Sequence, residues 1–142
     1  MATLTELKPK RMLTGRLNHN SDLLNELTEI CVRENITLGQ IRAIGAVQKA
    51  CIGFYDQQKQ TYMFKSQDKP LEITQLIGNV SLKDGKPFVH AHITLSDEEG
   101  RAFGGHLAEG TIIFACEVFI EIFDGTALER GFDETTGLGL WQ

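Results

Sequence analysis

The sequence predicts an α+β domain, with antiparallel strands joined by hairpins and one main helix packed on the sheet. Apolar residues recur at every second position through most of the chain after residue 40, which is the pattern of half-buried β-strands. A stretch before residue 35 instead shows helical spacing. Reversals at Asp84-Gly85 and at 97–100 are typical of the turns that join antiparallel strands.

Length and charge restrict the classes of protein to which the chain can belong. Its 142 residues suit one domain, and we place the core at about 12–124 and a C-terminal tail at 125–142. The net charge of −5 argues against a strongly basic nucleic-acid surface, although a local basic patch stays open. No apolar run approaches the roughly 18 residues of a membrane span, and residues 1–12 lack the apolar centre of a signal peptide.

The cysteines indicate the compartment in which the protein works. Cys31, Cys51 and Cys116 are odd in number and stand far apart among apolar neighbours. Such residues are usually buried free thiols of a reducing compartment. We therefore expect a cytoplasmic protein without membrane contact.

The N-terminal part is expected to form one strand and one helix. Residues 12–17 predict the first strand, after the short basic run 8–11. A helix from about Ser21 to Glu34 follows, because Asn20-Ser21-Asp22 supplies an N-cap and the apolar residues after it lie on one stripe. That stripe comprises Leu23, Leu24, Leu27, Ile30 and Cys31. Asn35 fits the left-handed position that ends many helices.

The remaining strands are predicted from period-two patterns between turn signals. The expected strands are 41–47, with a bend at Gly45, and then 50–55, 61–65, 72–82, 87–95 and 111–123. In 111–123 the even positions are all apolar and predict the buried face, whereas the odd positions mix apolar residues with Glu117 and Glu121. A mixed second face indicates partial cover by a helix or a neighbouring subunit. For the tail we expect a polar turn, one helical turn and a Gly-rich end.

Three of the chain's four histidines lie between residues 90 and 106. His90 and His92 are two apart on a predicted strand, so both side chains project from the same face. The opposite face carries the apolar row Val89, Ala91, Ile93 and Leu95, which predicts burial. The reversal at 97–100 returns the chain through Gly104-Gly105 to His106, which could bring a third imidazole beside the first two. The pattern predicts a metal or polar-ligand site on the sheet face that looks away from the core.

Several chemical roles are open for this cluster. Three neutral imidazoles suit zinc or a similar divalent ion and leave one coordination position open to water. Such a water can supply hydroxide near neutral pH, with Glu117 or Glu109 as a base, which is the chemistry of a small hydrolase or lyase. The site could instead be a structural clip or a small-ligand sensor, or the histidines could simply hydrogen-bond across strands or a subunit interface.

The neighbouring glycines and Glu117 also have two interpretations each. Gly104-Gly105 either cradle an anion with backbone N–H groups or permit a close strand approach. Glu117, in the middle of its predicted strand, is either a ligand-shell acid near the histidines or a rim residue that faces water.

The chain resembles the plant-and-prokaryote-conserved (PPC) domain nearly from end to end. The stretches that carry the resemblance are Ile41–Val47, Phe54-Tyr55-Asp56, Leu71–Val80, Asp84-Gly85-Lys86-Pro87, His90-Ala91-His92, Gly104–Gly110 and Ala115–Val118. A lone His-x-His would be a weak signal. Gly-Gly-His-Leu fourteen residues later, followed by a long strand that carries Glu, makes the pattern specific.

The resemblance implies properties that the residues alone do not give. Members of this family form a mostly antiparallel sheet flanked by helices, and they assemble as trimers. In plants the domain follows an AT-hook that contacts DNA, and stand-alone prokaryotic members are usually described as candidate DNA-binding proteins. Some members hold a metal at the cluster that corresponds here to His90, His92 and His106. This chain has no Arg-Gly-Arg-Pro hook, so it is more similar to the short prokaryotic members.

Two functions of different class follow as expectations. The first is a homotrimeric regulator associated with transcription, which binds DNA or a DNA-bound partner. It depends on the resemblance, because the acidic chain gives it little support of its own. The second is a metal-dependent hydrolase or lyase, or a ligand sensor, and it depends on the three histidines, with zinc as the expected ion.

Overall fold

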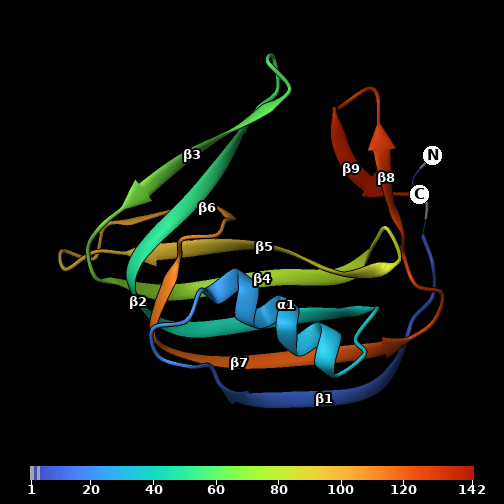
Figure 1. Cartoon of the computed structure of the whole chain (residues 1–142), viewed down its shortest axis with the longest axis horizontal. Coiled ribbons are helices and arrows are strands. Elements are labelled where there is room, and N and C mark those ends of the chain that lie inside the picture. Colours follow the sequence, from blue (N-terminus) through green and yellow to red (C-terminus); the bar gives the residue numbers. More distant parts are fainter. Residues whose placement is uncertain (1, 3) are drawn as a thin grey trace.

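The computed structural model describes residues 2 and 4–142 and shows a curved antiparallel sheet with a helix against one face (Figure 1). Within these residues the main sheet has seven strands in the order β1-β7-β2-β4-β5-β6, and β3 pairs with β2 outside this path. The predicted α+β class with a mostly antiparallel sheet is confirmed. The resemblance implied several helices, whereas the described residues contain one.

The predicted helix and strands occur in the predicted order, and β6, β8 and β9 are additional strands that were not predicted. The elements are β1 (Lys8–Arg16), α1 (Leu23–Arg33), β2 (Gly39–Asp56), β3 (Thr61–Gln67), β4 (Leu71–Lys83), β5 (Lys86–Ser96), β6 (Ala102–Leu107), β7 (Ile112–Asp124), β8 (Arg130–Asp133) and β9 (Leu138–Trp141). The strands predicted at 41–47 and 50–55 are two halves of β2. The bend predicted at Gly45 is present, because the register of β2 with β4 shifts between Ala43 and Gly45.

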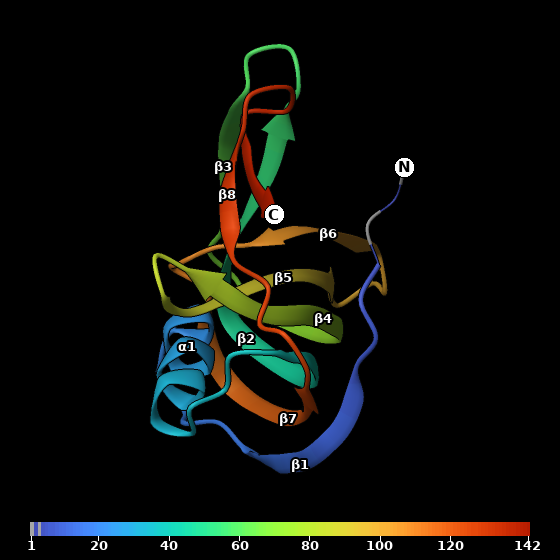
Figure 2. The ribbon, with the colours of Figure 1, turned by 90° about the vertical axis from the view of Figure 1, so that its right-hand side faces the viewer.

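Strand β2 joins the two parts of the sheet. Its first half lies between β4 and β7, and its second half pairs with β3 and, through Ile52 and Gly53, with β6. Because β4, β5 and β6 also pair in sequence, β2, β4, β5 and β6 close into a ring. The second half of β2 rises with β3 as an arm beside the β8–β9 hairpin (Figures 1 and 2).

Helix α1 is fixed at both ends by the residues that the sequence indicates. Asp22 is the N-cap, and one carboxylate oxygen accepts the N–H of Asn25 at 3.0 Å. Its other oxygen accepts the N–H of Gly110 at 2.6 Å, which ties the start of the helix to the turn before β7. Asn35 has a φ of 53° after the last turn, as predicted. The buried stripe Leu23, Leu27 and Cys31 packs into the core between α1 and the sheet.

Burial along β7 departs from the prediction at its first residues. Cys116, Val118, Ile120 and Ile122 are buried as expected, but Ile113 is fully buried and Phe114 is 58% exposed. In the β2–β7 register Ala46 pairs with Ala115 and Val47 with Ile113, so Phe114 is an extra residue in β7. The expectation that Phe114 faces the core was therefore wrong, because an extra residue reverses the alternation of faces.

The sheet face opposite α1, which we call the open face, is only partly covered. Its exposed apolar side chains are Met12, Ile44, Ile77 and Phe119. Two of them, Ile77 and Phe119, lie in one row across the sheet with Arg42 between them, because Ile77 pairs with Arg42, and Arg42 pairs with Phe119. Opposed residues in antiparallel strands project from the same face. Nothing within residues 2 and 4–142 packs over this row as α1 packs over the other face.

The tail forms the β8–β9 hairpin, where we expected a helical turn and a Gly-rich end. Its base is joined to β4, because the N–H of Leu82 donates to the carbonyl of Leu128 at 2.8 Å. Its turn is joined to the arm, because the Tyr55 hydroxyl donates to the carbonyl of Thr136 at 2.7 Å. The amide of Gln60 also donates to the carbonyl of Thr135 at 3.2 Å. The two hairpins therefore contact each other beyond the sheet edge (Figure 2).

No helix in the described part of the chain is long and apolar enough to cross a membrane.

Candidate metal centre

Strands β5 and β6 bring His90, His92 and His106 together on the open face. The alternate residues of β5, including Val89 and Ala91, are buried as predicted. His92 lies directly opposite His106 in the β5–β6 register. The ring centroids are 5.1 Å apart for His90 and His106, 5.2 Å for His90 and His92, and 5.8 Å for His92 and His106. One ligand atom from each side chain lies within 4.8 Å of the other two.

Glycines allow β6 to fit between β5 and β2 at this point. A Cβ at Gly105 would lie 2.7 Å from the carbonyl oxygen of Gly53, and one at Gly104 would overlap the carbonyl oxygen of Ile93. Of the two interpretations of Gly104-Gly105, the close strand approach therefore has direct geometric support. Both residues lie within β6 and pair with β5.

Tyr62 of the arm lies against the cluster. Its ring centroid is 4.8 Å from that of His106, with the planes tilted by 34°. Gly53 stands opposite His106 in the sheet, and a Cβ there would come within 3.2 Å of the Tyr62 ring. Tyr62 also contacts the ring of Tyr55, at a centroid distance of 5.1 Å. No sequence pattern indicated this contact, since Tyr62 lies on a separate hairpin.

Arg130 of β8 approaches the cluster from the other hairpin. Its Nη2 donates to Asn79 Oδ1 at 2.9 Å, and its Nε donates to Ser81 Oγ at 2.8 Å. Asn79 is the residue directly opposite His90 in the β4–β5 register, so both side chains project from the open face. Sequence reasoning missed Arg130 because no strand was expected in the tail.

Burial and neighbouring charges lower the pKa of two of the three imidazoles, His90 and His106, and so favour their neutral forms. Burial, followed by the charges of His106, Arg130 and His92, lowers the pKa of His90 from 6.5 to about 4. Burial and the charges of His92 and Arg130 also lower the pKa of His106. Nδ1 of His106 is buried and has no hydrogen-bond partner among the described residues. Neutral imidazoles and an unpaired buried ring nitrogen are what a metal ligand set requires before it binds its ion.

The donor set fits one transition-metal ion. Three imidazoles are a common ligand set for zinc, which binds each nitrogen at about 2.0–2.1 Å and leaves a fourth position open. Donor atoms within 4.8 Å of one another can reach such an ion after small side-chain rotations. When bound, the ion would supply a Lewis acid and an acidic water at this point of the open face.

The two candidate acids lie elsewhere. Glu117 is exposed on β7 opposite Ile44, and β2 and β4 lie between β7 and β5 in the sheet. It borders a hollow of about 380 Å³ with Met12, Ile44 and Phe119. Glu109 is exposed in the turn between β6 and β7. Neither carboxylate belongs to the group that gathers around the histidines within one chain.

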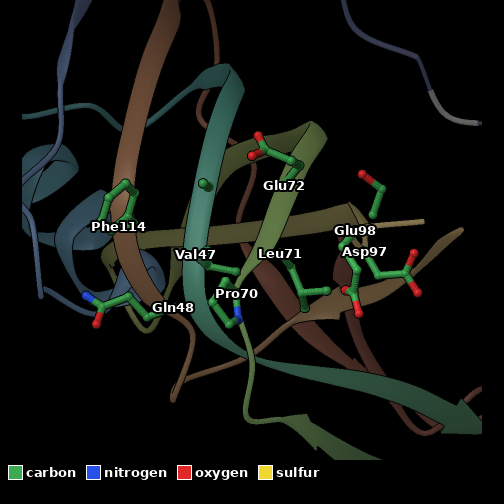
Figure 3. Close-up of a pocket in the computed structure, with 10 residues that line it drawn as sticks. Val47, Gln48, Pro70, Leu71, Glu72, Asp97, Glu98 and Phe114 are labelled. Carbon is green, nitrogen blue, oxygen red and sulfur yellow. The ribbon is translucent and has the colours of Figure 1, made fainter. Parts of the chain in front are cut away.

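A second hollow, of about 410 Å³, lies beside the bend of β2 (Figure 3). Val47 and Leu71 line it, with Phe114 at one end and Asp97 and Glu98 at the other. Asp97 is already paired, since its carboxylate accepts the Nε–H of Arg101 at 2.9 Å. This hollow is separate from the histidine cluster.

Solved structures similar to this chain extend over nearly its whole length. The metal-containing protein AF0104 from Archaeoglobus fulgidus is 44% identical, with a TM-score of 0.95 and 99% of each chain covered. A plant- and prokaryote-conserved (PPC) protein from Pyrococcus horikoshii is 36% identical, with a TM-score of 0.93, and 99% of this chain and 97% of that chain are covered. A protein from Ralstonia eutropha JMP134, described as a "putative DNA-binding protein", is 26% identical, with a TM-score of 0.81 and coverage of 91% and 89%.

A curated relative shares the domain within a much longer protein. The bifunctional protein GlmU of Synechococcus sp. strain JA-3-3Ab is 32% identical over 134 residues. The match covers 91% of this chain but only 19% of that protein, so the chain spans about a fifth of the length of its curated relative. The model of the Plants and Prokaryotes Conserved (PCC) domain matches residues 4–124, which include the three histidines of the cluster. The chain belongs to the plant- and prokaryote-conserved domain family.

Proposed function

We propose that His90, His92 and His106 bind one divalent metal ion, with zinc as the first candidate. The observation that carries this proposal is the convergence of three ligand atoms within 4.8 Å on one sheet face, one of them from a residue whose Nδ1 is buried and unpaired. The description of the 44% identical Archaeoglobus protein as metal-containing supports it. The neutral state of the two perturbed histidines also favours metal over proton near pH 7.

Elemental analysis of purified, untagged protein tests this proposal. We expect one zinc or similar ion per chain, and we expect it to be lost in a His90→Ala, His106→Ala double variant. The double variant should remain folded with a cooperative melt, because these side chains lie off the apolar core. His19→Ala is the matched control, because this fourth histidine lies before α1 and binds the carbonyl of Phe114 instead. Equal metal content in both variants would refute the proposal.

A metal with an open position can serve as a catalyst or as a sensor of a small ligand. Either role uses the water or ligand position that three protein donors leave free. A metal-dependent hydrolase or lyase requires turnover that disappears in the double variant and remains in His19→Ala. A sensor requires ligand binding without turnover. Retention of the metal together with absence of both properties would leave only a structural clip.

A role as a regulator that binds DNA or a DNA-bound protein is the second candidate. The relative from Ralstonia eutropha, described as a DNA-binding protein candidate, favours it. The net charge of −5 opposes it, since DNA affinity depends on clustered Lys and Arg that release counterions. A duplex mobility shift that weakens steeply as salt rises would support this role. The absence of a shift at about 50 mM salt would remove it.

We further propose that the chain assembles as a cytoplasmic homotrimer through the open face. Four exposed apolar side chains, Met12, Ile44, Ile77 and Phe119, gather on this face, and exposed apolar residues of this kind are often covered by subunits. A second copy is the occupant we propose, because closed symmetric assemblies of identical chains are the commonest way to cover such a surface. The free thiols Cys31, Cys51 and Cys116 fit a reducing compartment.

A further inference from the structure

Arg130 is a half-buried cation without an acidic partner. Its three hydrogen bonds go to neutral acceptors: Asn79 Oδ1, Ser81 Oγ and the carbonyl of Gly139. No carboxylate among residues 2 and 4–142 forms an ion pair with it, although Arg11, Arg33, Arg42 and Arg101 all have one. A partly desolvated guanidinium remains charged, so the fold retains an uncompensated positive charge at this point.

The position of Arg130 is fixed rather than adaptable. Its Cζ lies 5.2 Å from the ring centroid of Phe88 and 5.7 Å from that of Trp141. These aromatic contacts and the bonds to β4 hold the guanidinium plane from several sides. Each Nη nitrogen carries a second N–H that the bonds to Asn79 and Gly139 do not use. A pre-positioned guanidinium with free N–H groups is an anion-binding group.

This free charge lies beside the histidines. Asn79, which binds Arg130, is directly opposite His90 on the open face. Ser81, the second acceptor, is likewise opposite Phe88. Lys83 adds a further positive charge, with its Nζ 5.3 Å from the centroid of the Phe88 ring. Glu129, which precedes Arg130 in the sequence, accepts the N–H of Gly85 with its carboxylate at 3.3 Å.

We propose that Arg130 binds the carboxylate of a small organic acid that occupies the open position of the three-histidine metal site. This inference rests on the proposed metal function and names the class of ligand that the site takes. A carboxylate has two oxygens, of which one can face the metal site while the other accepts an N–H of Arg130. Arg130 is thus a positioning and specificity residue, distinct from the metal ligands.

The surroundings favour a carboxylate over an inorganic phosphate. Phosphate sites usually gather several donors, such as a helix N-terminus or a nest of backbone N–H groups. Helix α1 packs on the opposite face of the sheet, and its N-terminus is capped by Asp22, so it offers no donors at this position. The side chains around the proposed position include the rings of Tyr62, Phe88 and Trp141, which suit the carbon skeleton of an organic ligand.

Trp141 supplies a direct readout, because it is the chain's only tryptophan and its ring lies over Arg130. Zinc-loaded protein, with its zinc content measured first, is titrated with malonate while tryptophan emission is followed, and the affinity is checked by calorimetry. We expect saturable binding at or below millimolar malonate. Arg130→Gln should weaken malonate binding at least tenfold at unchanged zinc content. Arg130→Lys should recover only part of this loss, because lysine keeps the positive charge but lacks the planar guanidinium that can donate two parallel hydrogen bonds to a carboxylate.

Three controls make the outcome decisive. Arg101→Gln removes a surface arginine paired with Asp97 and Glu99 and should leave malonate affinity unchanged. Malonamide, which has the same skeleton without charge, should not bind. Inorganic phosphate should bind more weakly than malonate; tighter binding of phosphate would overturn the ligand class.

Failure of the inference and failure of the metal proposal give different results. One zinc per chain with no malonate binding, or with equal malonate affinity in wild type and Arg130→Gln, would overturn the role of Arg130 alone. Absence of zinc from the loaded protein would overturn the metal proposal and with it this inference.

Discussion

The imidazoles converge because three glycines leave no side chain where strands must approach. Gly53, Gly104 and Gly105 lie at the junction of β2, β5 and β6, where an added Cβ would meet backbone or ring atoms. The sequence could predict that His90 and His92 share a face, since this depends only on strand periodicity. The turn at 97–100 predicts that the chain returns toward His106. It does not predict the register that places His106 directly opposite His92.

Gly104→Ala should therefore destabilise the protein by about 1–3 kcal/mol, the usual cost of forcing an extra methyl group into a packed site. Its Cβ would overlap the carbonyl oxygen of Ile93 and separate β5 from β6. Gly15→Ala in β1 is the matched control, since no atom lies within 4 Å of a Cβ there. Urea unfolding of both variants checks the prediction, and equal midpoints would contradict it.

The pKa of His90 makes the stability of the metal-free protein depend on pH. Its pKa is about 4 in the folded chain, against an ordinary value of 6.5 in the unfolded chain, so below pH 6.5 the unfolded chain binds a proton that the folded chain does not. The contribution of neutral His90 is complete above pH 6.5 and should be lost progressively as the pH falls from about 6.5 to 4. Urea unfolding in EDTA at pH 7.5, 6.0 and 5.0 measures this loss.

His90→Gln is the control for this pH dependence. The variant cannot gain the proton at residue 90, so its stability should fall less than that of the wild type over the same pH interval. Parallel curves for the two proteins would show that the desolvation of His90 does not contribute.

The β8–β9 hairpin is the element that the sequence did not reveal. Each of its strands has four residues, and Gly131 and Gly139 interrupt any apolar alternation. Its position depends on contacts with distant residues, such as Tyr55 with Thr136 and Arg130 with Asn79. Periodicity in the sequence therefore could not predict the position of Arg130. It also could not predict the extra residue in β7, because that residue is defined by the pairing of β7 with β2.

The helix start offers a test at the level of one element. Asp22→Ala removes both the cap to Asn25 and the bond to the Gly110 N–H, and should destabilise the protein by about 1–2 kcal/mol. Asp22→Asn should lose less, because its one amide oxygen can still cap the helix while its NH₂ cannot accept from Gly110. Thermal unfolding of the two variants measures the difference. Identical losses would indicate that the bond to Gly110 adds nothing beyond the cap.

The proposed assembly can be tested with two phenylalanines that differ in location. Phe119 is 48% exposed on the open face, and Phe132 is 73% exposed on the β8–β9 hairpin. We expect sedimentation of the wild type to show a trimer at micromolar concentration. Phe119→Asp should dissociate it, since a charge in a covered apolar surface is unfavourable, whereas Phe132→Asp should not. A wild-type monomer, or dissociation by Phe132→Asp alone, would contradict the proposed interface.

The order of the strands in the sheet differs greatly from their order along the chain, and this affects synthesis. Strand β1, made first, pairs with β7, which is completed only at Asp124. Strand β2 likewise waits for β4, β6 and β7. During synthesis, the edges of β1 and β2 therefore stay unpaired until the last of the main strands has left the ribosome. Because the sheet depends on pairings between residues far apart in the sequence, we expect it to fold more slowly than a helical domain of this size.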